Sequence, residues 1–169
     1  MIHPSAIVSP HARIYGNVDI GEHSRIDDGV ILTGDIKIGA YCHIAAYAVL
    51  TGRAGITIGD YVGISMFSVL LTGSDDFSGR SMVGPTVPEK YKPFLQKGPI
   101  SIGRNCIIGA HSTIMPNVKI GNGVSVGAYS LVKGDCEDDS IYAGRPAQFM
   151  KTRSLASWEL VKRLENELV

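Results

Sequence analysis

The chain has 169 residues, 44% of them hydrophobic, which suffices for one domain with a continuous core and is short for two. Lysine plus arginine and aspartate plus glutamate number 16 each, so the net charge is zero, and neither a nucleic acid nor a membrane is an expected partner. The segment Met1-Ile2-His3-Pro4 does not look like a secretion signal, and no apolar run is long enough to span a bilayer. With three cysteines and no CxxC pair, we expect a cytoplasmic protein.

Aliphatic residues recur at every sixth position from the start of the chain, at Ile2, Val8, Ile14, Ile20, Ile26, Leu32, Ile38, Ile44, Leu50 and Ile56. After a slip of two residues the series continues from Ile58 to Leu70, and after an interruption it resumes from Ile102 to Val132. The residue four positions after each aliphatic is usually small. A period of six fits neither a helix nor a plain alternating strand, but it fits a short strand followed by a corner. Three such units make a triangular coil, and stacked coils give parallel sheets around one aliphatic core.

This pattern resembles the hexapeptide-repeat acyltransferases. The repeats predict an all-β fold, and the resemblance makes it a left-handed parallel β-helix, an exception to the usual crossover hand. We expect the β-helix domain to cover residues 1–153. Three residues, Cys42, Cys106 and Cys136, fall on the small inward position, so we interpret them as core residues rather than nucleophiles or metal ligands.

The outward positions form one column for each face of the predicted coil. One column is polar, which predicts a face exposed to solvent; it consists of Asp19, Lys37, Gly55, Ser101, Lys119 and Glu137. Another is mostly apolar although it points away from the core; it consists of Arg13, Ile31, Val49, Val69, Thr113 and Leu131. The corner next to it carries Tyr47, Phe67, His111 and Tyr129. Exposed apolar strips mark interfaces, and the resemblance implies trimers with parallel coils, so we predict a homotrimer.

Residues 71–99 interrupt the repeat. Such long loops are usually functional or disordered, and four prolines with Phe77, Tyr91 and Phe94 favour an ordered arm that packs against something. In the family, a loop at this place reaches over the active site of a neighbouring subunit. Residues 154–169 predict a C-terminal α-helix with Ser154 as a possible cap. Its apolar stripe includes Trp158, which we expect to pack the helix onto the body.

Several features predict a binding site for acetyl-CoA. Small residues at successive corners leave room for a thin pantetheine arm; they are Gly109, Ala110, Gly127 and Ala128. The segment Tyr142-Ala143-Gly144-Arg145-Pro146-Ala147 is close to an Ala-Gly-x-Pro-Ala element that lies beside the coenzyme in the family. Candidates to bind the coenzyme phosphates are Lys133, Arg145, Lys151 and Arg153.

The catalytic base cannot be carried over from the galactoside and maltose acetyltransferases, which the chain resembles from about residue 56 to 150. Those enzymes place a histidine directly after a Thr-Gly pair, whereas here Thr72-Gly73 is followed by Ser74. The Ser-Asp-Asp-Phe-Ser-Gly start of the loop and the later Pro85-Thr86-Val87-Pro88 look like sugar acyltransferases of surface-polysaccharide pathways.

Of the five histidines, His43 is the favoured base. It points outward between Cys42 and Ile44, on a face that a neighbouring subunit should cover, and imidazole titrates near neutral pH. We expect Asp75 or Asp76 to orient it or to contact the sugar. His111 is the other candidate, although we interpret it first as a packing residue.

Together these features predict an acetyl-CoA-dependent acetyltransferase that acts on a sugar amine or hydroxyl, without a metal. A nucleotide-linked aminodeoxysugar or a surface-polysaccharide sugar is the expected acceptor. One alternative is a γ-type carbonic anhydrase, but its zinc site needs a pair of histidines five residues apart, which this sequence lacks. The other is a non-catalytic β-helix trimer.

Overall fold

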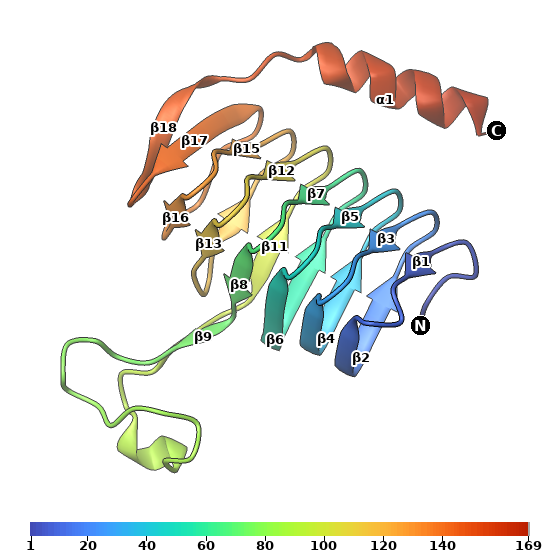
Figure 1. Ribbon diagram of the computed structural model, residues 1–169. Helices are drawn as coiled ribbons and strands as arrows, with labels where there is room; N and C mark the ends of the chain where they lie inside the picture. Colours follow the sequence, from blue (N-terminus) through green and yellow to red (C-terminus); the bar gives the residue numbers. More distant parts are fainter. Residues whose placement is uncertain (169) are drawn as a thin grey trace.

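The computed structural model describes residues 1–168 and shows a β-solenoid whose chain winds through stacked, three-sided coils (Figure 1). One sheet contains, in spatial order, β1 (Ile7–Val8), β3 (Arg25–Ile26), β5 (His43–Ile44), β7 (Gly63–Ile64), β12 (Ile107–Ile108), β15 (Ser125–Val126), β17 (Ser140–Gly144) and β18 (Ala147–Thr152). All neighbours in this sheet are parallel except β17 and β18. The fold is therefore the parallel β-helix that the repeats predict.

The other two faces share a second sheet, because its long strands continue across a corner. This sheet contains β14 (Lys119–Ile120), β11 (Ile100–Ile102), β6 (Val49–Ile58), β8 (Val69–Leu71), β13 (Thr113–Ile114) and β16 (Leu131–Val132), together with β2 (Arg13–Ile20) and β4 (Ile31–Ile38). Strand β6 pairs with β8 at its start and with β11 at its end. The predicted apolar column is in register: Arg13 pairs with Ile31, Ile31 with Val49, Val49 with Val69, Val69 with Thr113, and Thr113 with Leu131.

The core is the aliphatic ladder of the repeat. Its central members, such as Leu32, Leu50 and Ile108, have no exposed surface. The three cysteines lie in this core, as predicted, and burial raises the pKa of each thiol to about 11. The thiols therefore stay protonated at neutral pH and are poor nucleophiles.

The slip in the repeat lies before Ile56 and not after it, which corrects the sequence-based frame. Ile36 pairs with Ile56 and Ile38 with Ile58, so β6 has two extra residues within Arg53–Gly55, where β4 has only Asp35. As a result, Thr57 takes the place in the polar column that the sequence assigns to Gly55. The six-residue count missed this because Ile56 is aliphatic in either frame.

The predicted aromatic corner is present as a stack of rings. Tyr47, Phe67, His111 and Tyr129 follow one another with ring centroids 5.4, 4.9 and 4.7 Å apart. All four residues have φ near +60°, which turns the chain sharply from one face to the next. The side chains remain exposed at the corner.

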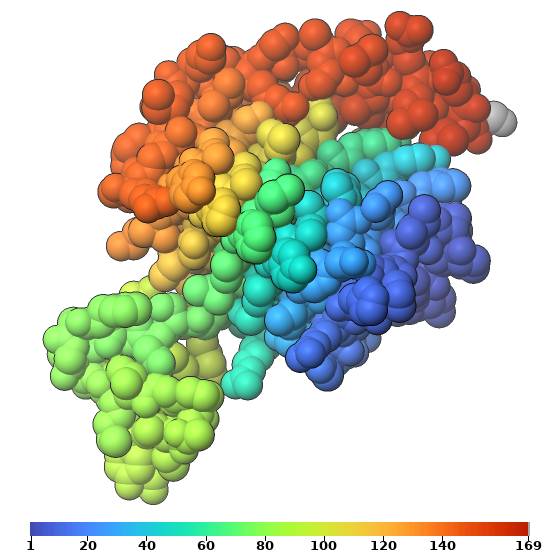
Figure 2. Space-filling model, in the orientation of Figure 1, coloured from blue at the N-terminus to red at the C-terminus, as the bar shows by residue number. Residues whose placement is uncertain are grey.

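The interruption of the repeat forms an arm that projects from the solenoid. Strands β9 (Gly73–Ser74) and β10 (Gln96–Lys97) pair antiparallel at its base, and a 3₁₀ turn, Glu89–Tyr91, lies further out. Figure 2 shows the arm, green to yellow-green, standing away from the body. Within residues 1–168, Phe77 of the arm is 93% exposed, so the surface against which the arm is predicted to pack would belong to a partner in the trimer predicted below.

The chain ends with a hairpin and a helix. Strands β17 and β18 pair antiparallel, which the repeat did not predict, and α1 (Ala156–Glu167) then lies along the solenoid (Figure 1). Trp158 packs the helix onto the body, as expected, and donates a hydrogen bond from Nε1 to Asp139 Oδ1 at 2.7 Å. Ser154, the predicted cap, accepts a hydrogen bond from the Ala156 amide at 3.3 Å, and Leu155 takes the N-cap position itself with helical φ and ψ. Val169, the last residue of the predicted helix, lies outside the described residues.

No helix within residues 1–168 combines the length and apolar character needed to span a membrane.

We predict a homotrimer built on the apolar column, with a mass in light scattering of about three times 18.1 kDa. Val49 is half-buried in this column. Val49→Glu should dissociate the trimer, because the interface would then bury a carboxylate without a partner, which is costly in free energy. Lys37→Glu in the polar column is the control and should leave the mass unchanged. A monomeric parent chain would contradict the interface.

Candidate functional site

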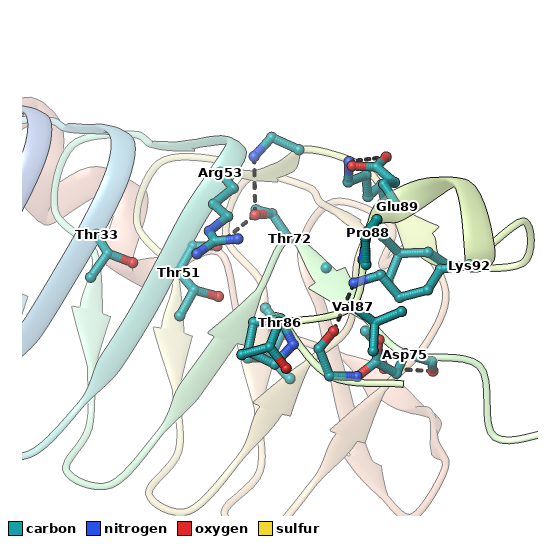
Figure 3. Close-up of a pocket in the computed structure, with 18 residues that line it drawn as sticks. Thr33, Thr51, Arg53, Thr72, Asp75, Thr86, Val87, Pro88, Glu89 and Lys92 are labelled. Atoms are coloured by element: carbon teal, nitrogen blue, oxygen red, sulfur yellow. Dashed lines mark hydrogen bonds and ion pairs between the residues drawn. The ribbon is translucent and has the colours of Figure 1, made fainter. Parts of the chain in front are cut away.

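A cavity of about 860 Å³ lies between the arm and the solenoid (Figure 3). The solenoid contributes Thr33, Thr51, Arg53, Ala54, Leu71 and Thr72 to its wall. The arm contributes Gly73, Ser74, Asp75, Gly84, Pro85, Thr86, Val87, Pro88, Glu89, Lys92, Leu95 and Lys97. The lining combines apolar side chains with a few charged groups, as is usual in sites for small molecules.

Asp75 lies in the wall of this cavity. Its Oδ2 atom accepts a hydrogen bond from the Gly84 amide at 2.9 Å, which links the start of the arm to its middle. The side chain is half-buried. This bond leaves the carboxylate with further acceptor positions for a ligand.

Asp76 is used by the arm itself. Its carboxylate accepts hydrogen bonds from the Ser78 amide at 3.0 Å, from the Ser78 hydroxyl at 2.7 Å and from the Arg80 amide at 2.9 Å. The hydrogen bonds from Ser78 come first among the causes that hold the pKa of Asp76 below its ordinary value. Asp76 does not line the cavity, so its geometry indicates a structural role.

His43 lies on β5, away from the cavity. Its Nε2 atom is 2.7 Å from Asp27 Oδ2, and Arg25 Nε is 2.6 Å from Asp27 Oδ1. We predicted from the sequence that Asp75 or Asp76 orients His43, but within one chain its hydrogen-bond partner is Asp27. Burial favours a higher pKa for Asp27, yet the hydrogen bonds from Arg25 and His43 outweigh it and lower that pKa.

The next coil leaves open space beside His43. Its strand neighbour is Gly63, and no atom lies within 4 Å of where a Gly63 side chain would begin. The imidazole is 51% exposed. His111, the alternative base, is stacked between Phe67 and Tyr129, which fits its interpretation as a packing residue.

The predicted coenzyme groove follows the corner that carries the aromatic stack. The amides of Gly109 and Gly127 donate to the carbonyls of Val126 and Tyr142, both at 2.8 Å. The amides of Ala110 and Ala128 donate to no acceptor within residues 1–168. Because these two alanines occupy the same corner on successive coils, their N–H groups can serve an extended ligand that runs along the groove.

The predicted phosphate-binding cations lie at the same end of the solenoid but have different surroundings. Arg145, in the turn between β17 and β18, donates from Nε to the Tyr129 carbonyl at 2.6 Å and has its guanidinium over the Tyr129 ring. Lys133 and Lys151 are exposed. Arg153 donates to the carbonyls of Asn105 and Gly123 and so anchors the segment before α1.

The unpaired cations of the cavity within residues 1–168, Arg53 and Lys92, were not among the sequence candidates. Arg53 belongs to the two extra residues of β6, and Lys92 lies in the arm. The slip in the repeat could have identified Arg53, because an insertion into a regular coil places a side chain outside the inward and outward columns of the repeat. Nothing in the sequence distinguishes Lys92 from the exposed Lys90.

No group of three potential metal ligands occurs among residues 1–168. A family model for bacterial transferase hexapeptide repeats matches residues 17–52 and 99–134. The dTDP-4-amino-4,6-dideoxy-D-glucose acyltransferase of Escherichia coli is 37% identical over 158 residues, which cover 90% of this chain and 82% of that protein.

Solved structures of AntD, an N-acyltransferase from Bacillus cereus, are also similar. One, with dTDP and coenzyme A, has a TM-score of 0.95 at 41% identity and covers 98% of this chain and 91% of that chain. Another, with dTDP-4-amino-4,6-dideoxyglucose and coenzyme A, has a TM-score of 0.94 at 41% identity and covers 97% and 89%. A third contains dTDP and 3-hydroxybutyryl-CoA. These structures include AntD variants in which a single aspartate or a single serine is replaced.

The repeats, the three-sided solenoid and these relatives agree. The relatives are acyltransferases, and the solved ones bind coenzyme A, which separates this chain from the non-catalytic trimer considered above. The chain belongs to the hexapeptide-repeat transferase family, has its left-handed parallel β-helix fold, and is a sugar acyltransferase that uses an acyl-CoA.

Proposed function

We propose that the chain transfers an acyl group from acyl-CoA to the amino group of a nucleotide-linked aminodideoxysugar. The observation that carries this is the cavity beside the arm, which contains a carboxylate, Asp75, and the cations Arg53 and Lys92. An ammonium group needs an anionic partner and a nucleotide diphosphate needs cationic ones, so both ends of such a substrate find a partner here. The similarity to AntD, which binds dTDP-4-amino-4,6-dideoxyglucose, supports the same substrate class.

The reaction is a direct attack on the thioester. The sugar nitrogen, once deprotonated, attacks the carbonyl carbon, the tetrahedral intermediate collapses, the carbon–sulfur bond breaks, and the CoA thiolate leaves. Asp75 would hold the ammonium form of the sugar. The substitution of an aspartate in AntD makes an aspartate the residue to examine first in this chain.

His43 is proposed as the acceptor of the amine proton. Since Asp27 can only accept hydrogen bonds when ionised, Nε2 of the neutral imidazole carries the proton and Nδ1 keeps its lone pair. In the trimer, the arm of one subunit would close over the face of its neighbour that carries His43. This arrangement brings Asp75 of one subunit and the His43–Asp27 pair of the next to one site.

The acceptor and donor are tested together with purified protein. dTDP-4-amino-4,6-dideoxyglucose and dTDP-6-deoxyglucose differ only by amine and hydroxyl at C4, and each is supplied with acetyl-CoA or 3-hydroxybutyryl-CoA while thiol release is followed. We expect turnover with the amino sugar and none above background with the hydroxyl sugar. Equal turnover with both sugars, or turnover of neither, would contradict the proposal.

The coenzyme site gives a separate prediction. Arg145→Glu should weaken acetyl-CoA binding by about 1–3 kcal/mol, because a cation held at the groove by Tyr129 becomes an anion that repels the coenzyme phosphates. Calorimetric titration with acetyl-CoA measures this, and Arg163→Glu on the exposed part of α1 is the control. If both variants bind as the parent does, the phosphates bind elsewhere.

A further inference from the structure

The cavity between arm and solenoid contains two cations, Arg53 and Lys92, that no carboxylate of residues 1–168 holds in an ion pair. Of its charged residues, Lys97 is paired with Glu89, and Asp75 accepts a hydrogen bond from the Gly84 amide. Arg53 and Lys92 form no ion pair with any residue in the described part of the chain. In Figure 3 Arg53 lies on the solenoid side of the cavity and Lys92 on the arm side.

Lys92 is the more unusual of the two, because it is only 9% exposed. Its ammonium group donates to the Gly84 carbonyl at 2.9 Å, which satisfies one of three donors with a neutral acceptor. A lysine is rarely buried without an anionic partner, since its desolvation is not compensated. An anionic ligand in the cavity would supply such a partner.

Arg53 reaches the cavity through a local departure from the repeat. The two extra residues of β6 are fixed by Thr72, whose hydroxyl accepts a hydrogen bond from the Ala54 amide at 3.1 Å and donates one to the Thr51 carbonyl. Thr72 is 1% exposed, so a buried side chain fixes the two extra residues of β6 in place. Arg53 itself is exposed at the cavity, and its planar guanidinium can bind phosphate oxygens in a bidentate manner.

We infer that this cavity binds the diphosphate of the nucleotide-linked sugar, with Arg53 of the solenoid and Lys92 of the arm as its cationic ligands. The inference rests on the proposed function and assigns one part of the substrate to one part of the site. Because the two cations come from opposite walls, a bound diphosphate bridges them and holds the arm against the solenoid. Asp75, which lies on the same wall as Lys92, is then the partner of the sugar amine.

Titration of the full chain with thymidine, thymidine monophosphate and thymidine diphosphate tests this. Affinity should rise with each phosphate, and Arg53→Ala and Lys92→Met should each weaken diphosphate binding about 10- to 100-fold, as expected for charge-assisted hydrogen bonds. Lys92→Arg should restore most of the loss. The controls are Lys90→Met, an exposed lysine on the same arm, and Arg163→Ala on α1, and both should bind the diphosphate as the parent does.

Coenzyme A is titrated in parallel, because it also carries a diphosphate. Unchanged CoA affinity in Arg53→Ala and Lys92→Met, with weakened thymidine diphosphate binding, supports the assignment. Weakened CoA binding with normal thymidine diphosphate binding would place the coenzyme in this cavity and overturn it. If both variants bind thymidine diphosphate normally while the parent acylates the amino sugar, this inference is wrong and the proposed function stands. If the parent acylates no nucleotide-linked sugar, the proposed function itself fails.

Discussion

Asp75→Asn is expected to lower the turnover of amino-sugar acylation by about 10- to 100-fold, the loss expected when a charge-assisted hydrogen bond to the substrate ammonium is removed. Asparagine keeps the size of the side chain and an oxygen that can accept from the Gly84 amide, so the arm should keep its conformation. What is lost is the negative charge that is proposed to hold the substrate ammonium. The measurement is kcat with dTDP-4-amino-4,6-dideoxyglucose and saturating acyl-CoA, together with the melting temperature.

Asp76→Asn provides the matched control, one residue away on the same arm. Asp76 bonds Ser78 and Arg80 and does not line the cavity, so this variant should lower the melting temperature more than it lowers turnover. Equal losses of turnover in both variants would attribute the effect to folding of the arm. Turnover of Asp75→Asn within threefold of the parent would remove Asp75 from the mechanism.

Most of the fold could be predicted because each six-residue unit repeats the same physical requirement. An inward aliphatic and a small inward residue per unit determine which side chains stack, so the column from Ile31 through Val49 and Val69 to Leu131 could be assigned from spacing alone. The same counting placed the cysteines in the core. It failed at Arg53–Gly55, because Ile56 satisfies the pattern in two frames and spacing cannot choose between them.

The site was harder to predict because it depends on segments outside the repeat. No period relates the arm to the solenoid, so the cavity and the burial of Lys92 could not be derived from spacing. The Asp27–His43 pair could have been found, since Arg25 lies directly below His43 in the ladder and Asp27 follows two residues later at the corner. The adjacent pair Asp75 and Asp76 was correctly located in the arm, but their different roles depend on its conformation.

The Asp27–His43 pair determines what an imidazole at this position can do. Asp27 lies between two partners: the Arg25 guanidinium is 2.6 Å from its Oδ1 atom and the His43 imidazole is 2.7 Å from its Oδ2 atom. Because the hydrogen bonds from Arg25 and His43 outweigh burial and lower the pKa of Asp27, this carboxylate stays ionised at neutral pH. An ionised Asp27 therefore favours the neutral His43 tautomer that carries its proton on Nε2, and the lone pair of Nδ1 then lies on the side of the ring away from Asp27.

His43→Ala is expected to leave the predicted trimer and the affinity for acetyl-CoA unchanged and to lower turnover by about 10²- to 10⁴-fold, because the proposed acceptor of the amine proton is removed. A purely structural histidine would show the reverse, a lower melting temperature with near-normal turnover in the folded protein. Asp27→Asn is the companion variant: its amide can donate to Nε2 and so favour the wrong tautomer, which should also reduce turnover while the imidazole is retained. The measurements are turnover, its pH profile and the melting temperature of both variants. If His43→Ala keeps turnover within threefold of the parent, His43 is not the base, and Asp75 and His111 become the residues to compare.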